Sequence, residues 1–266
     1  MGLKKRVIPV LLLRDGKLVQ SRNFSRYSVI GNPWASATRM SSWSSDELVY
    51  LDISQRVSEN LVASGHADLL RKISKSTNIP LAFGGGIRTE SQAREILQSG
   101  ADKVVLNTLL FQDPKVVRQI VDTFGSQAVV ASLDVRESPS GEFIVYRGGV
   151  KASDLSLQSI LERIHELGCG EILVNSMDRD GSSIGFNLKL VKKVTLLSEI
   201  PVIALGGAGN WQHFEEVLTQ THVSAAAGAN IFHHSENSVY QCKKFLVDKN
   251  VAVRMPPPLR DSPSEV

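Results

Sequence analysis

Two glycine-rich stretches are the first candidates for chemistry. In one, Gly84–Gly86 follow a short apolar run and precede a helix predicted from Thr89. Glycines let the backbone pass close to a ligand, and the free N–H groups at a helix start favour an anion such as phosphate. Asn107 and Thr108 end the next apolar run and could supply further donors. A tight turn without any ligand would leave the same pattern.

The second half of the chain repeats this arrangement. An apolar run ends at Gly206 and Gly207, and the next one is followed by Ala229 and Asn230. Gly206 follows Gly84 by 122 residues (206 − 84 = 122). Such repetition indicates two versions of one design. It implies a substrate with a phosphate at each end, or one working site and a relic of the other.

The elements that position these residues alternate between strand and helix. Strands are predicted at Val7–Leu13, Leu48–Ile53, Leu81–Phe83, Ala101–Leu106, Ala128–Val135, Glu171–Asn175, Val202–Leu205 and Val223–Ala227. Helices are predicted from Pro33 and at Leu61–Ser76, Thr89–Gln98, Pro114–Phe124, Leu155–Leu167, Leu188–Leu197, Trp211–Thr219 and Ser235–Asp248. Eight such units close into an α/β (β/α)8 TIM barrel, here residues 1–254, whose ligands bind at the carboxyl ends of the strands.

Three other segments complete the predicted organisation. A loop is expected over Asn23–Asn32, and a hairpin over Glu137–Gly149 with FIVYR as its return strand. The proline-rich tail at residues 255–266 is expected to be disordered.

Composition excludes several classes of protein. The chain has 266 residues, 42% of them apolar, and a net charge of +3, which is too small to indicate a nucleic-acid partner. Its apolar runs are strand-length, so no membrane span is expected, and the run at Val7–Leu13 lacks the cleavage site of a signal peptide. Cys169 and Cys242 fit no metal spacing and suggest a reducing cytoplasm.

Several spaced motifs resemble one family. They are RVIPVLLLRDGKLV, DELVYLDI, FGGGIRT, GADKVVLNT, VVASLDV, GEILVNSMDRDG and LGGAGN, in this order from Lys4 to Arg254. They resemble the cyclase subunit of imidazole glycerol phosphate synthase. The resemblance implies a half-barrel duplication, a bis-phosphate site, no cofactor, no metal, and a glutaminase partner at the N-terminal face. Ammonia from that partner would cross the barrel and join a ribulose-linked aminoimidazole precursor.

The resemblance also assigns site residues. One phosphate would be held by Gly85, Gly86, Asn107 and Thr108, and the other by Gly181, Gly206, Gly207, Ala229 and Asn230. Asp134, which ends a strand, and Asp180, in the loop after the next strand, would be the catalytic carboxylates.

The first strand departs from the family pattern. The family has an acid at its end, where this chain has Leu12, and Gln20 replaces a lysine of the following loop. Chemistry of this kind uses two opposed carboxylates, and losing an acid or base costs about 10² to 10⁴ in rate. Asp15 is displaced by three positions and reads as a turn residue.

The family's ammonia gate is retained. By resemblance it comprises Arg6, Glu47, Lys103 and Glu171 at the N-terminal ends of four strands, with Asp102 facing the glutaminase. Four charges inside a narrow barrel are costly unless paired, so a neutralising layer of salt bridges is the alternative reading.

Four functions fit these observations. The favoured one is a synthase-type subunit that delivers ammonia to another acceptor, as in the amidination of surface sugars for lipopolysaccharide, with help from a separate sugar amidotransferase. The alternative is the imidazole glycerol phosphate cyclase of histidine biosynthesis. The others are a non-catalytic bis-phosphate-binding scaffold and a sugar isomerase, which would also need an acid on the first strand.

Overall fold

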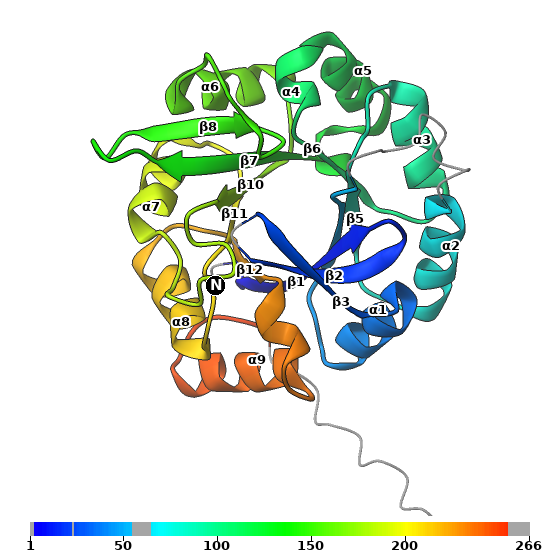
Figure 1. Cartoon of the computed structure of the whole chain (residues 1–266), viewed down its shortest axis with the longest axis vertical. Coiled ribbons are helices and arrows are strands. Elements are labelled where there is room, and N and C mark those ends of the chain that lie inside the picture. The colour runs from blue at the N-terminus through cyan, green and yellow to red at the C-terminus, as the bar shows by residue number, and fades with distance from the viewer. Residues whose placement is uncertain (1–2, 23, 55–64, 255–266) are drawn as a thin grey trace, which may run out of the picture.

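A computed structural model describes residues 3–22, 24–54 and 65–254. Eight parallel strands form a ring that closes where β10 pairs with β7 (Figure 1). The strands are β1 (Arg6–Arg14), β4 (Leu48–Asp52), β5 (Leu81–Gly84), β6 (Lys103–Leu106), β7 (Val129–Glu137), β10 (Glu171–Ser176), β11 (Val202–Leu205) and β12 (Ala225–Gly228). The predicted (β/α)8 barrel is thus confirmed.

Helices surround the strands as an outer ring (Figure 1). They are α1 (Pro33–Ser42), α2 (His66–Ser76), α3 (Glu90–Gln98), α4 (Leu109–Gln112), α5 (Pro114–Phe124), α6 (Leu157–Leu167), α7 (Leu188–Leu197), α8 (Trp211–Gln220) and α9 (Ser238–Asp248), with short 3-10 turns η1 (Ser126–Ala128) and η2 (Asn230–His233). Positions 61–64 of the predicted second helix, and the predicted tail at 255–266, lie outside the described residues.

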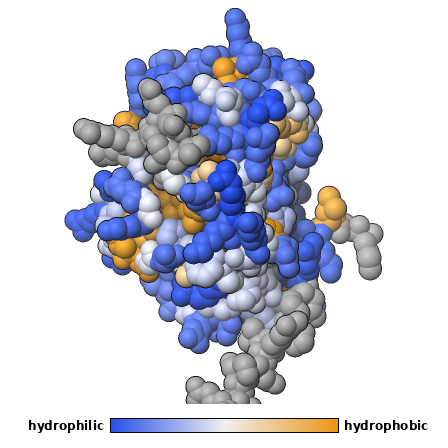
Figure 2. All heavy atoms as spheres, turned by 90° about the vertical axis from the view of Figure 1, so that its right-hand side faces the viewer, coloured by the Kyte–Doolittle hydropathy of each residue, from blue (hydrophilic) through white to orange (hydrophobic). Residues whose placement is uncertain are grey.

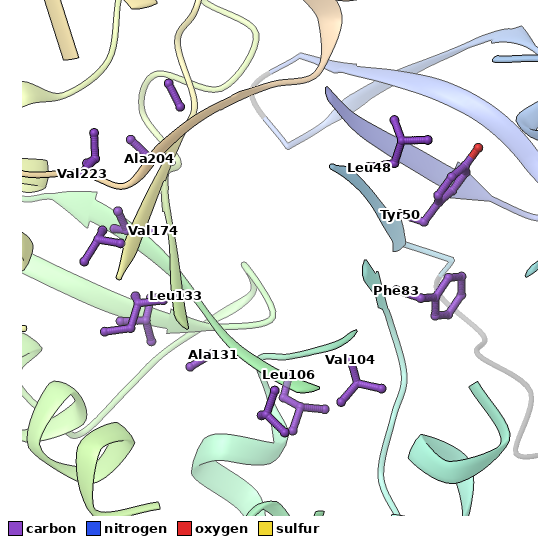
Figure 3. Packing of buried hydrophobic residues seen from close by; sticks show 14 of the residues in the cluster. Leu48, Tyr50, Phe83, Val104, Leu106, Ala131, Leu133, Val174, Ala204 and Val223 are labelled. Carbon is purple, nitrogen blue, oxygen red and sulfur yellow. The ribbon is translucent and has the colours of Figure 1, made fainter. Parts of the chain in front are cut away.

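Each strand alternates between two apolar cores, as the two-residue period of a strand requires. Side chains such as Tyr50, Phe83 and Val104 point outward and pack under the helices (Figure 3). Side chains such as Ile8 and Val105 fill the barrel interior. Because residues two apart share a face, this alternation determines which side chains at the end of a strand point into the barrel mouth.

The predicted loop at Asn23–Asn32 is wrong. Within it the chain forms β3 (Arg26–Gly31), which pairs with the preceding β2 (Lys17–Arg22) in an antiparallel hairpin that continues the sheet from β1. The sequence hides it because β3 is mostly solvent-exposed and lacks an apolar face. The predicted second hairpin is confirmed, with β8 (Phe143–Arg147) returning along β7 and the short β9 (Lys151–Ala152) beyond it.

The outer surface is mainly hydrophilic on the side that Figure 2 shows, with smaller apolar areas between. Within the described ranges, no helix has both the length and the apolar character needed to cross a membrane. Cys169 and Cys242 are both buried and free.

Candidate functional site at the barrel mouth

Asp134 and Leu12 face each other across the mouth. Their strands, β7 and β1, are four steps apart in either direction around the ring of eight. Leu12, like Leu51 and Ala229, packs against the edge of the interior core, so it does point into the barrel. The position at which the resemblance expects an acid is therefore part of an apolar wall, and Leu12 itself offers no group that could transfer a proton.

Asp134 is buried and held by three donors. The Nδ2 atoms of Asn107 and Asn175 donate to its two carboxylate oxygens, at 2.9 and 3.2 Å, and the backbone N–H of Gly149 donates as well. Burial raises the pKa of Asp134 to about 6, because desolvation of the charged form outweighs these hydrogen bonds. Such a carboxyl group changes protonation state close to neutral pH, as a general acid or base requires.

Asp180 lies close enough to act on Asp134. Its Oδ2 accepts hydrogen bonds from Ser21 Oγ at 2.9 Å and from Phe24 N at 3.3 Å. Burial raises the pKa of Asp180, and the charge of Asp180 contributes to the raised pKa of Asp134. The two carboxylates predicted as catalytic thus share one mouth, but Asp180 is engaged by the β2–β3 hairpin.

Residues predicted for the first phosphate lie on neighbouring strand ends. Gly85 and Gly86 have positive φ values of 121° and 65°, and the backbone of Asp52 leaves no room for a side chain at Gly85. Asn107 Oδ1 accepts a hydrogen bond from Gly148 N at 2.8 Å, while its Nδ2 serves Asp134. Both ends of the Asn107 side chain are therefore engaged within the protein.

Thr108 immediately follows Asn107 and precedes α4. A Cβ added at Gly148 would stand 3.0 Å from Thr108 Oγ1, so the turn between β8 and β9 covers this part of the mouth closely. The structure brings together the first predicted set of phosphate residues.

Residues predicted for the second phosphate lie under the other hairpin. Asn230 Nδ2 donates to the carbonyl oxygen of Ser21 at 2.7 Å, and a Cβ at Gly181 would approach that oxygen to 2.8 Å. Gly206 and Gly207 have φ values of 97° and 102°, which favour glycine. Ala229, the residue before η2, and Asn230 follow β12 at this end of the barrel, and β2 contacts Asn230.

A pocket of about 310 Å³ opens beside this second set. Its lining includes Asn230 and, from the LGGAGN motif, Ala208, Gly209 and Asn210. It also includes residues that neither predicted phosphate set contained: Ser183, Trp211, Ile231, His234 and Ser235. The N–H groups that begin α8 and η2 border the pocket, which suits an anion. In the sequence, Gly209 and Asn210 were the residues that could have indicated this pocket.

A ring of four charges lies at the opposite, amino-terminal end of the barrel. Arg6 pairs with Glu47 at 2.8 Å and also with Glu171. Lys103 pairs with Glu47 at 2.9 Å and with Glu171 at 2.6 Å. The ring is closed and electrically neutral, as the alternative reading of a neutralising salt-bridge layer requires.

The two acids of this ring have different environments. Burial raises the pKa of Glu47, which is only 2% exposed. Burial would also raise the pKa of Glu171, but attraction and hydrogen bonds from Arg6 and Lys103 outweigh it, so that pKa is lowered. Glu47 is therefore the member that depends most on its partners.

Several residues of the mouth were missed from the sequence. Asn175, Gly149 and Phe24 contact Asp134, Asp180 or each other, yet they lie on different elements. Only Asn175, a polar residue at the end of an apolar strand, carried a local signal. Asp15 is confirmed as a turn residue, with φ of 52°, and no group of three potential metal ligands occurs in the described part of the chain.

Comparison with known proteins identifies the family. Residues 6–238 match the family model described as "Histidine biosynthesis protein". The chain is 40% identical over 254 residues to imidazole glycerol phosphate synthase subunit HisF of Chlorobaculum parvum, and 38% identical over 253 residues to that of Alkaliphilus metalliredigens. Both alignments cover 95% of this chain and 99% or more of the relative. With a barrel mouth and a charged floor in the expected places, this chain belongs to the HisF family of imidazole glycerol phosphate synthase subunits.

Proposed function

We propose that this chain is the synthase subunit of a glutamine amidotransferase complex. Ammonia enters through the charged floor, crosses the barrel and reacts at the mouth with a phosphorylated acceptor beside Asp134. The observation that carries the proposal is the closed ring of Arg6, Glu47, Lys103 and Glu171, which concentrates four costly charges on the barrel axis. The proposed enzyme class is a lyase or cyclase-type subunit without a cofactor.

A glutaminase is the proposed partner. The relatives are named as subunits of a synthase, which supports a second chain. The amino-terminal face is the side nearest the charged ring, so a source of ammonia docks there. Asp102, exposed beside Lys103 at that end, is proposed to face the partner.

The names of the relatives favour imidazole glycerol phosphate as the product. Asp134 and Asp180, both with raised pKa values, are the carboxylates available for acid–base work. The two glycine turns at opposite sides of the mouth suit a substrate with a phosphate at each end. We therefore place this reaction first.

A second candidate rests on Leu12. Ring closure by two opposed carboxylates is impaired when one of them is a leucine. Delivery of ammonia to another acceptor, such as an N-acetyl sugar converted to its acetamidino form by a separate amidotransferase, does not require that acid. The names of the relatives give this candidate no support, so it depends on the mouth alone.

One experiment separates the two candidates. The purified chain is supplied with ammonium salt and the ribulose-linked precursor, and imidazole glycerol phosphate is measured directly. Ammonium salt removes any dependence on the glutaminase. Turnover at a rate typical of enzymes, about 1 s⁻¹ or more, supports the cyclase. If Leu12 is the lesion, the wild type is slow and Leu12→Asp raises the rate about 10²-fold or more.

Leu51→Asp is the matched control, because Leu51 is the register partner of Leu12 and also contacts the interior core. An equal gain from both substitutions would show that a charge anywhere in the mouth suffices. If neither variant nor the wild type makes product, and a glutaminase subunit is not bound, the scaffold reading replaces both candidates.

A further inference from the structure

Asn175 is a buried amide that uses only one of its two polar ends. It is the last residue but one of β10, directly between Asp134 on β7 and Leu205 on β11 in the strand register. Its side chain is 8% exposed. Nδ2 donates to Asp134 Oδ1 at 3.2 Å, whereas Oδ1 has no hydrogen-bond partner among the described residues.

The unpaired oxygen lies against the second glycine turn. A Cβ placed on Gly206 would come within 2.9 Å of Asn175 Oδ1. Burying an amide carbonyl without a partner costs about 1–3 kcal/mol, so such groups call for a reason. An asparagine that tied β10 to β11 would use this oxygen, and Asn175 does not.

Asn107 shows the contrast. It also donates to Asp134, but its oxygen accepts from Gly148 N, so it holds the turn after β8 as well as the carboxylate. Asn107 therefore has a structural role in addition to its contact with Asp134. For the side chain of Asn175, the hydrogen bond to Asp134 is the one present among the described residues.

We propose that Asn175 is a positioning residue for Asp134, one that holds the carboxylate in its ionised form and directs it across the mouth toward Leu12. An N–H donor stabilises a carboxylate and does little for a carboxylic acid. Leu12, and not an acid, occupies the opposite position on β1, so on this proposal the ionisation of Asp134 depends on its immediate neighbours. Among the described residues, the ionisable side chains beside Asp134 include Asp180, whose charge acts on Asp134, and Tyr146, its register partner on β8.

The proposal deepens the function proposed above but is tested without a substrate. The whole chain is labelled with ¹³C at aspartate carboxyl carbons, and the Asp134 signal, assigned with Asp134→Asn, is followed against pH by NMR. Wild type should titrate near pH 6. Asn175→Leu, which keeps the volume but removes the donor, should move the midpoint to about 7 or higher, since a hydrogen bond to a charged group is strong.

Ser176→Ala is the matched control. Ser176 is the next residue, is also buried, and its Oγ has no partner in the described part of the chain. Its strand neighbours on the same face, Ile172 and Val174, belong to the core under the helices, so it faces away from Asp134. The midpoint should stay where it is in the wild type.

Thermal unfolding at two pH values separates positioning from a structural role. At pH 5 Asp134 is mainly protonated, so Asn175→Leu should leave Tm unchanged or raise it. At pH 8 the carboxylate is ionised and has lost a donor, so Tm should fall. Equal losses at both pH values, or an unmoved Asp134 midpoint, would overturn the proposal. Asn175→Ala, which also removes the donor, gives the same comparison if the leucine variant does not fold.

Discussion

The burial of Asp134 lowers the stability of the folded protein when its carboxyl group is ionised. The mouth buries its carboxyl group and supplies two amide donors and one backbone donor, yet its pKa stays raised at about 6. A carboxyl group whose pKa is higher in the folded than in the unfolded state costs stability once it ionises. The folded protein thus carries a destabilising buried charge at the barrel mouth, beside which a reactant would bind.

This cost predicts the behaviour of Asp134→Asn. While Asp134 is protonated it adds no buried charge to the folded protein. The stability of the fold is therefore fully present below the unfolded pKa of this group, about 4, and part of it is lost as pH rises through the folded pKa of about 6. Asn avoids that loss, so the variant should be more stable than wild type at pH 8, by about 2 kcal/mol, and equal to it near pH 4. Denaturant unfolding at both pH values measures this. Synthase activity should be lost at every pH.

Leu12 and Asn175 show why the contacts at the barrel mouth could not all be predicted from single positions in the sequence. Leu12 could be compared with the family pattern because it is in a motif. Asn175 also lies in a motif, but that motif does not show that it contacts Asp134, 41 residues away on the neighbouring strand.

Two structural elements decide what reaches Asp134. The β2–β3 hairpin contributes Ser21 and Phe24 to the mouth and contacts Asp180 and Asn230. The turn between β8 and β9 contributes Gly149, and a Cβ there would touch the ring of Phe24 at 3.0 Å. The two hairpins therefore meet above the carboxylate, and a substrate must be accommodated between them.

The charged floor is the element with the clearest energetic consequence. Removing Lys103 leaves Glu47 buried with Arg6 as its only remaining partner in the ring. Lys103→Met should destabilise the protein by about 3 kcal/mol, the usual cost of leaving a buried charge short of a partner. Denaturant midpoints of the variant and the wild type measure this loss.

The double variant Lys103→Met/Glu47→Gln should recover most of that stability, because it removes the orphaned acid as well. Lys115→Met, at an exposed position of α5, should change stability little. A loss in the single variant no larger than that of Lys115→Met would contradict the reading of the ring as a mutually dependent unit.

At the scale of the whole molecule, the barrel is sealed within the described residues. β12 pairs with β1, and Lys5 bridges to Val253 and donates its N–H to Ala252 O at 2.7 Å. The chain therefore returns to its starting edge by residue 253. This closure supports the proposed domain boundary after Arg254.

Deletion of residues 255–266 should leave Tm and activity unchanged, since the barrel closes without them. Differential scanning calorimetry on the shortened and full chains checks this. A chain ending at Val251, which loses the contacts of Ala252 and Val253 with Lys5, should unfold at a lower temperature. Equal Tm values for these two truncations would mean that the closure contributes nothing measurable.

The sequence by itself determined the strand order, the glycine turns and which polar residues stand at strand ends. These follow from local periodicity and from turn residues such as Gly206, which the chain displays in any context. Tertiary structure alone decided that Leu12 faces Asp134, which ion pairs join the four charges of the floor, and that residues 26–31 form a strand. Each of these depends on contacts between distant segments, and no local pattern records which residues the closed barrel brings together.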